Sequence, residues 1–149
     1  MTQRTYSTRR NALAVALKGK IKEINNRGSY VSSVAEVYTQ LKFFDDITDF
    51  PAVLVIAGQE TRDYQTAGYR DRYLDFRIMV FVREENPLDA CEAILEDIET
   101  VIETNGRLAY EDRTGTTQTT HDITVLSIST DEGTLDPISI GEMSVRVHY

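Results

Sequence analysis

Side chains that carry general acid–base or nucleophilic chemistry are few in this sequence. The chain contains two histidines, His121 and His148, and one cysteine, Cys91. His121 stands beside Asp122, an order that suits a catalytic base held by its acid, although such a pair more often begins a strand. The histidines are isolated along the chain, and Cys91 falls on the apolar side of a predicted helix, where a thiol is buried and inert. We therefore predict no catalytic residue.

Motifs for phosphate, metal or acyl-group chemistry are also absent. The sequence contains no GxGxxG, GxxxxGK, HExxH or GxSxG segment. The nearest approach to a cation site is an acidic segment with Asp45, Asp46 and Asp49. Loops that bind hard cations are usually turned by a glycine, and this segment has none, so a solvated acidic loop is expected. No metal ion or cofactor is predicted.

Tyrosine and arginine gather in one polar stretch, Gln59–Asp71, and its immediate surroundings. The residues are Tyr64, Tyr69, Arg62, Arg70 and Arg72. Tyrosine and arginine are the residue types that anchor protein interfaces. A polar stretch of this length between two strands either serves a function or is disordered. We predict an assembly interface that orders on binding; the alternative is an exposed loop of accidental composition.

Charge is divided unevenly between two segments. Residues 1–27 have one acid and seven bases: Arg4, Arg9, Arg10, Lys18, Lys20, Lys22 and Arg27. Residues 84–104 have eight acids and no base. Four of these acids lie on one predicted helix face: Glu92, Glu96, Glu99 and Glu103. Like charges at this spacing repel by roughly a few tenths of a kcal/mol per pair. We predict that a basic partner offsets this, either the first helix or another protein; the alternative is a solvated acidic face.

Length and composition predict one globular domain over residues 1–149. Hydrophobic residues make up 41% and charged residues 27%, which is ordinary for a chain that buries a core. The net charge of −8 excludes the basic footprint of a nucleic-acid-binding protein and any attraction to an anionic membrane. No apolar run reaches the roughly 18 residues of a membrane helix. The basic start precedes an amphipathic segment rather than a signal peptide, so synthesis in a cytoplasm is expected.

Apolar periodicity predicts two helices. The first runs from about Ser7 to Asn26, with Ser7 or Thr8 as its cap and Gly28 just past its end. Its apolar stripe is Leu13, Leu17, Ile21 and Ile24. The second helix begins at Pro87 and ends near Thr104. Its apolar face is Leu88, Cys91, Ile94, Leu95, Ile98 and Ile102.

Five strands are predicted between and after these helices. They cover Val34–Leu41, Pro51–Gly58, Arg72–Val82, Ile123–Ser129 and Ile140–Tyr149. The run Pro51–Gly58 is apolar throughout, as in a strand covered on both faces. Arg72–Val82 alternates, which is typical of one buried face. In the fourth strand we expect Ile123, Val125 and Ser127 to share a face. The fold class is α+β: a mainly antiparallel sheet with two helices on one face and a long extended β-hairpin.

The order of these segments resembles a known family. The segments are STRRNALAVALKGKIKEI, FPAVLVIAGQE, RYLDFRIMVFV, DACEAILEDIETVIE and GEMSVRVHY. Together they are similar to the tail terminator proteins of long-tailed phages, the group that includes the minor tail protein U type. The resemblance covers nearly the whole chain. It rests on patterns of helices and strands, and it brings no catalytic residue.

The resemblance implies a structural protein of the virion. Family members form a hexameric ring that caps the tail tube, ends its growth and presents a surface for head attachment. The implied partners are other copies of the chain, the tail tube protein and a head-completion or neck protein. DNA would pass through without sequence-specific binding, and the location would be the head-proximal end of the tail. The alternatives are another neck or tail-completion ring protein, or a small enzyme or ligand-binding α+β domain.

Overall fold

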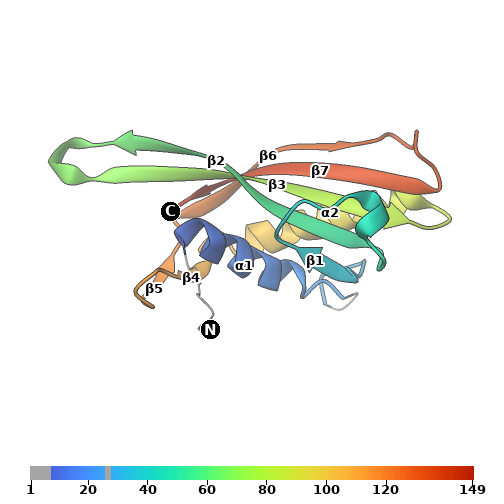
Figure 1. Cartoon of the computed structure of the whole chain (residues 1–149), viewed down its shortest axis with the longest axis horizontal. Coiled ribbons are helices and arrows are strands. Elements are labelled where there is room, and N and C mark those ends of the chain that lie inside the picture. The colour runs from blue at the N-terminus through green and yellow to red at the C-terminus, as the bar shows by residue number, and fades with distance from the viewer. Residues whose placement is uncertain (1–7, 26–27) are drawn as a thin grey trace, which may run out of the picture.

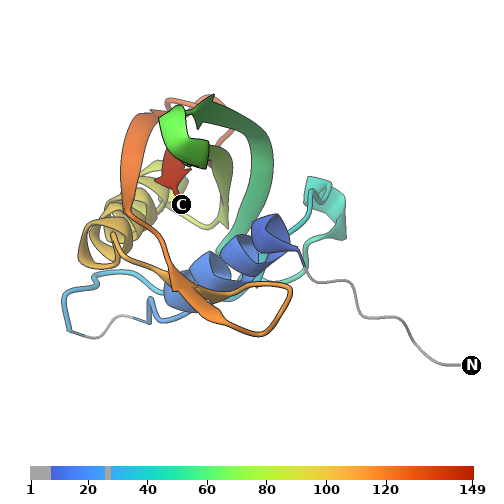
Figure 2. The same ribbon diagram turned by 90° about the vertical axis from the view of Figure 1, so that its left-hand side faces the viewer.

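Two helices lie on one face of a five-stranded sheet in the computed structural model, which describes residues 8–25 and 28–149 (Figure 1). The strand order is β1-β2-β3-β7-β6, and only β1 and β2 are parallel. The elements are α1 (Arg9–Ile21), β1 (Glu36–Tyr38), β2 (Ala52–Tyr64), β3 (Arg70–Arg83), α2 (Pro87–Thr104), β4 (Ala109–Glu111), β5 (Thr117–Thr119), β6 (Asp122–Thr130) and β7 (Ile138–His148). Seen end-on, the curved sheet arches over both helices (Figure 2). The predicted α+β class is confirmed.

Helix α1 begins where a cap was predicted and ends earlier than expected. The Thr8 side chain accepts a hydrogen bond from the Asn11 N–H at 3.1 Å. The helix ends at Ile21, and a tightened turn follows in which the Ile24 N–H donates to the Ile21 carbonyl at 3.1 Å. This turn keeps Ile24 in the core. The residues Arg4, Ser7, Asn26 and Arg27, used in the sequence predictions, lie outside the described ranges.

Helix α2 matches its predicted bounds and packs very close to the sheet. Its predicted apolar residues are buried except Leu88, which is half-buried. The close approach is at Gly141 of β7, where an added Cβ would lie 2.7 Å from the Cys91 Sγ and 2.9 Å from the Leu95 Cδ1. Only glycine leaves room for the helix at this point. Within the described ranges, neither helix has the length and apolar character required to cross a membrane.

The first part of β2, residues 52–55, is covered on both faces, as predicted for the apolar run. Val53 and Val55 join the core beneath the helices, and Ala52 and Leu54 join a second cluster on the opposite face. The second cluster also contains Ile47 and Phe81, with Phe44, Phe50 and Tyr38 packed against it. The predicted acidic loop, which includes the short 3-10 helix Phe44–Asp46, supplies this cover. Its aspartates Asp45, Asp46 and Asp49 are exposed.

The predicted long β-hairpin is confirmed, and its polar tip, Gln59–Asp71, expected as a loop, is mostly paired strand. β2 and β3 stay in register from Thr61↔Tyr73 to Tyr64↔Arg70, so only residues 65–69 form the turn. We call residues 61–73 the ribbon; it projects beyond the helices (Figure 1). It has no buried face and therefore no apolar alternation that would mark it as strand. Where it leaves the sheet, β2 has a register shift at Gly58, whose added Cβ would meet the Asp75 carbonyl oxygen at 2.8 Å.

Two further features differ from the sequence predictions. In β6 an extra residue, Leu126, shifts the register, so that Ser127 pairs with Ser144 and Ile128 with Met143. Ser127 therefore does not share the face of Ile123 and Val125 as expected, because the bulge reverses the alternation. The polar segment 107–121 also contains a hairpin, β4 and β5, that periodicity could not reveal in strands of three residues.

Candidate functional site

One face of the ribbon gathers most of its predicted interface residues. Arg62 pairs across the strands with Arg72, and Tyr64 pairs with Arg70. Cross-strand partners and residues two apart share a face, so these four side chains lie together. The Arg70 guanidinium lies 5.9 Å from the centroid of the Tyr64 ring, and Tyr64 is 68% exposed. Tyr69 lies in the turn and is 74% exposed.

The root of the ribbon is tied to the last residue of the chain. The Glu60 carboxylate accepts hydrogen bonds from the Tyr149 hydroxyl and from the Arg62 Nε, the latter at 2.7 Å. Burial by itself raises the pKa of Glu60, but these two donors outweigh it and leave the pKa below its usual value. Burial and the bond to Glu60 raise the pKa of Tyr149. Both side chains therefore keep their charge states, and their hydrogen bond, at neutral pH.

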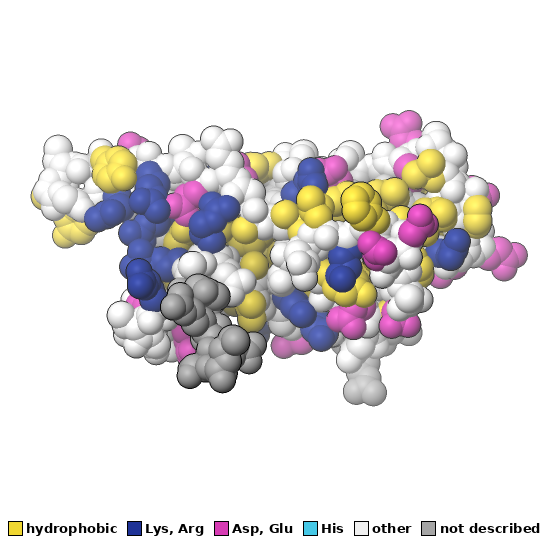
Figure 3. Space-filling view, in the orientation of Figure 1, with side chains coloured by type: hydrophobic (Ala, Val, Ile, Leu, Met, Phe, Trp, Pro, Cys, Tyr) yellow, Lys and Arg dark blue, Asp and Glu magenta, His cyan; other side chains and the backbone are white. Residues whose placement is uncertain are grey.

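Arginines from α1 meet the arginines of the ribbon at this root. Arg10 donates to the Gly58 carbonyl, and the Arg72 guanidinium lies 5.9 Å from the centroid of the Tyr149 ring. The Arg72 Nε is buried and finds no hydrogen-bond partner in the described part of the chain. We call the combined surface the basic band: Arg9, Arg10, Arg62, Arg70 and Arg72. Figure 3 shows basic side chains running from the ribbon toward the side where α1 begins.

The other predicted basic residues of α1 are not part of this band. The Lys22 Nζ lies 3.8 Å from the Glu36 Oε1 at the first strand, and Lys20 pairs with Glu23 at 3.9 Å. Lys18 is half-buried in the last turn of α1, away from the helix start. The structure therefore brings Arg10 to the root of the ribbon, with Arg9 next to it in the first turn of α1, and leaves Lys18 and Lys22 apart from it.

The four predicted glutamates form a continuous acidic ridge on α2: Glu92, Glu96, Glu99 and Glu103. All are exposed except Glu99, which is half-buried. Beside the ridge, α2 and β6 enclose a groove of about 460 Å³ lined by Asp89, Glu92, Ala93, Leu95, Glu96, Glu99 and Ile128. Among the described residues, no salt bridge includes a ridge glutamate. Within the described residues α1 of the same chain thus makes no salt bridge with this face, which leaves two of the predicted alternatives: an external partner and a solvated acidic face.

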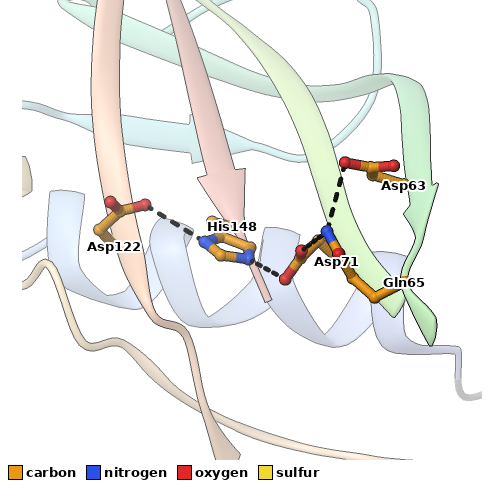
Figure 4. Close-up of polar contacts among 5 residues, drawn as sticks. All are labelled: Asp63, Gln65, Asp71, Asp122 and His148. Carbon is orange, nitrogen blue, oxygen red and sulfur yellow. Dashed lines mark hydrogen bonds and ion pairs between the residues drawn. The ribbon is translucent and has the colours of Figure 1, made fainter. Parts of the chain in front are cut away.

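The two histidines, expected to be isolated, come together at the ribbon root. His148 lies between two carboxylates (Figure 4): its Nε2 is 3.0 Å from the Asp71 Oδ1, and its Nδ1 is 4.0 Å from the Asp122 Oδ1. The His121 ring is 4.7 Å from the His148 ring. The hydrogen bond with His148 lowers the pKa of Asp71. Asp122 therefore faces His148 rather than its neighbour His121, and the cluster links the ribbon to β6 and β7.

The described residues include no group of three or more His, Cys, Asp or Glu side chains arranged to hold a metal ion. Cys91 is buried, and desolvation raises the pKa of its thiol, so it remains protonated. These side chains support packing and ion pairing, and among the residues that the structure describes no nucleophile is aligned with a base.

Two structural aspartates were not identified from the sequence. Asp97 is 3% exposed and accepts hydrogen bonds from the Val31 and Ser32 N–H groups and from the Ser32 hydroxyl. In the sequence, Asp97 is three residues after Ile94 and four before Val101. This spacing places it on the apolar face of the helix and could have indicated that it is buried. Asp112 organises the β4–β5 turn by accepting from the Thr114 N–H at 2.9 Å and the Thr116 N–H at 3.1 Å.

The chain is similar to known proteins in sequence and in fold. Residues 3–149 match the family described as Bacteriophage Tail Tube Terminator Protein. The chain is 36% identical over 111 residues to the Tail tube terminator protein p142 of Escherichia phage T5, covering 71% of this chain and 69% of that protein. A chain from the virion of a native gene transfer agent particle has a similar fold, with a TM-score of 0.55 and 11% identity over 95% of this chain and 93% of that chain. At that identity the last likeness shows the fold alone.

Proposed function

Because this chain belongs to the bacteriophage tail tube terminator family, it is a structural virion protein that caps the tail tube, and we propose that it does so as a homo-hexameric ring at the head-proximal end. The proposal of a ring rests on one observation: the basic band and the acidic ridge are two surfaces of opposite charge on the same chain. Ring contacts are heterologous, so every subunit must present two different complementary surfaces. A chain with one self-complementary patch would form a two-fold dimer instead.

The assembly interface of this proposal consists of the predicted charged and aromatic residues. They are Arg62, Tyr64, Tyr69, Arg70, Glu92, Glu96, Glu99, Glu103, Arg9 and Arg10. Lys18 and Lys22 complete the set predicted from sequence. They lie at the far end of α1, so they would contribute at the edge of the interface between subunits. Tyrosine and arginine are enriched among the few residues that contribute most of the binding energy of an interface, which favours specific contacts here.

The remaining partners follow from the position of such a ring. One face would bind the tail tube protein, and the other would bind a head-completion or neck protein. DNA would pass through the ring without sequence-specific contacts, which the net charge of −8 supports because it disfavours retention of a polyanion. The role is assembly without catalysis, cofactor or membrane, on a chain made in the host cytoplasm.

Electron microscopy of the purified chain with assembled tail tubes tests this function. We expect a ring of six subunits on one end of each tube, and tubes that stop growing once they carry it. Sedimentation of the chain alone reports whether the ring also forms without a template. Unlimited tube growth with bare ends, together with a monomer at every concentration, would contradict the proposal.

A further inference from the structure

We propose that the acidic ridge of one subunit lies against the basic band of the next, beneath its ribbon. The contact would place Glu92, Glu96, Glu99 and Glu103 of one copy against Arg9, Arg10, Arg62, Arg70 and Arg72 of its neighbour. The inference rests on the proposed ring and names the two surfaces that form its repeated contact. The ligand of the basic band is therefore a second copy of this chain.

The ribbon part of the basic band is an exposed surface that faces the helix side of the sheet. Leu74 of β3 points into the core beneath the helices, and Arg72 and Arg70 follow it at steps of two on the same strand. The arginine face of the ribbon thus looks toward the same side as α1 and α2, not toward the open face of the sheet. Residues 61–70 are all exposed. Within the described chain, nothing covers this overhanging face.

Charge on the band is only partly satisfied inside the subunit. Arg62 pairs with Glu60, and Arg10 donates to the Gly58 carbonyl. Among the described residues, no salt bridge includes Arg9, Arg70 or Arg72. The Arg72 guanidinium also lies beside the Tyr149 ring, with its Nε buried and without a hydrogen-bond partner among the described residues. Guanidinium groups bind carboxylates in a planar, two-bond geometry, so carboxylates are the matching partner.

The ridge fits this need in charge and in length. Its glutamates span eleven helical steps from Glu92 to Glu103, roughly 16 Å at about 1.5 Å per residue. The ribbon strand from Glu60 to Tyr64 spans roughly 13 Å at about 3.3 Å per residue. The groove beside the ridge has an apolar floor, with Leu95 and Ile128, that suits an aromatic ring. Tyr64, on the arginine face, and Tyr69, in the adjacent turn, are the exposed rings available to fill it.

Both surfaces occur on every copy and do not touch within one copy, which selects a second copy as the occupant. Pairing of ridge with band is directional, so it propagates from subunit to subunit, and it forms the proposed ring when the rotation between neighbours completes a circle. The same pairing also relieves the like-charge repulsion along the ridge. A tube or neck protein on either surface is the competing arrangement, and the experiment below separates the two.

Charge reversal on each surface tests the contact. The band variant carries Arg62→Glu and Arg70→Glu, and the ridge variant carries Glu96→Lys and Glu99→Lys. We expect each variant alone to cap roughly tenfold fewer tube ends than the wild type. Mixed one to one, the variants present opposite charges at every junction of an alternating ring, so capping should return. Native mass spectrometry should then show equal numbers of both variants in each ring.

The test needs two controls: a charge reversal outside the proposed contact, and a measurement that each variant is folded. Asp45→Lys combined with Asp49→Lys makes the same charge change as the ridge variant on the exposed loop at the opposite face of the sheet, and this variant should cap normally. Unchanged thermal unfolding shows that each variant is folded. Full capping by either reversal variant alone, or no recovery on mixing, would overturn the ridge–band contact while wild-type rings keep the proposed function intact. Absence of wild-type rings on tubes would instead remove the proposed function itself.

Discussion

Asp97 differs in its role from the other acids of α2. The ridge glutamates lie in solvent, whereas Asp97 turns inward and fixes the loop at Val31 and Ser32 through backbone and hydroxyl donors. A carboxylate removed from water requires such donors, because an unpaired buried charge is strongly unfavourable. One acid of this helix therefore stabilises the fold, and its neighbours are free to serve assembly.

Replacing Asp97 with Ala should lower the free energy of unfolding by about 2–3 kcal/mol, because buried donors lose a charged acceptor. Denaturant unfolding followed by circular dichroism measures this change. Glu96→Ala, on the exposed side of the same helix, is the matched control and should change stability by less than about 0.5 kcal/mol. Equal effects of the two substitutions would show that Asp97 does not hold the loop.

The β4–β5 turn should depend on pH through Asp112. Hydrogen bonds from Thr114 and Gln118 lower the pKa of this carboxyl to about 2, whereas an aspartate in an unfolded chain titrates near about 3.9. A lowered folded pKa stabilises the turn above roughly pH 4, and this contribution is lost as the pH falls toward about 2. We expect the Thr114 and Thr116 amide NMR signals to shift with a midpoint near that lower value.

Asp112→Asn is the control for this titration, since its amide keeps the shape of the side chain without the ionisable proton. The low-pH midpoint should disappear from the Thr114 and Thr116 amides in this variant. A midpoint near pH 4 in the wild type would show that the turn does not hold the charged form.

At the scale of elements, the close packing of α2 against β7 at Gly141 can be tested by substitution. Gly141→Ala should destabilise the protein by about 1–3 kcal/mol, because the new methyl group overlaps the Cys91 sulfur and the Leu95 side chain. Combining it with Cys91→Ala should recover part of the loss, since the deleted sulfur frees space and the two effects become non-additive. Thermal unfolding of the single and double variants measures both.

Gly106 offers the matched glycine, because an added Cβ there meets nothing within 4 Å. Gly106→Ala should leave the unfolding temperature nearly unchanged. If Gly141→Ala were equally harmless, the helix and strand would have to separate more easily than their packing indicates.

The ribbon is the element whose protection should change most on assembly. It has paired strands but no core of its own, and an isolated two-stranded hairpin is marginal in water. We expect its amides to exchange within seconds to minutes in the free subunit and far more slowly in the ring. Hydrogen exchange with mass spectrometry compares the two states, with the buried part of β3, residues 76–82, as the internal reference. Equal exchange of the ribbon in both states would exclude it from the interface.

Sequence patterns predicted those elements whose apolar side chains repeat over a buried face. Helix α2 and strand β3 were bounded closely for this reason, and β2 was recognised from its unbroken apolar run. The strand pairing in the ribbon was missed because its stability comes from backbone hydrogen bonds, which leave no side-chain period. The shift at Leu126 was missed because a bulge is set by register with β7. The His148–Asp71 contact joins residues of β7 and β3 that lie far apart in the sequence, and only the pairing of these strands in the folded sheet brings them together.

At the scale of the whole molecule, the family resemblance inferred from segment order is confirmed by the match over residues 3–149. The charge pattern behind the proposed interface was visible in sequence, but its geometry was not. Reading residues 1–27 as one basic segment placed Lys18 and Lys22 with Arg9 and Arg10. The fold divides them, because a helix carries its two ends to different neighbours.

Assembly of the wild-type ring should slow as salt is raised. Between about 0.01 M and about 1 M, the distance over which charges attract falls from roughly 30 Å to roughly 3 Å. The encounter of ridge and band should weaken over this range, because complementary charge mainly steers association. Light scattering during tube capping measures the rate. A rate independent of salt, with a ring of normal stability, would indicate that apolar and tyrosine contacts alone drive assembly.

The bulge in β6 affects how readily free copies associate through the edges of their sheets before they bind a tail tube. β6 is an outer strand of the sheet, and such a strand is a template on which another chain can add and begin a fibril. Leu126 interrupts its ladder near the middle, so the regular stretches on either side are only about four residues long. A bulge also twists the strand away from a flat approach. The bulge therefore disfavours edge-to-edge addition of another copy at β6, which would otherwise compete with assembly on the tube.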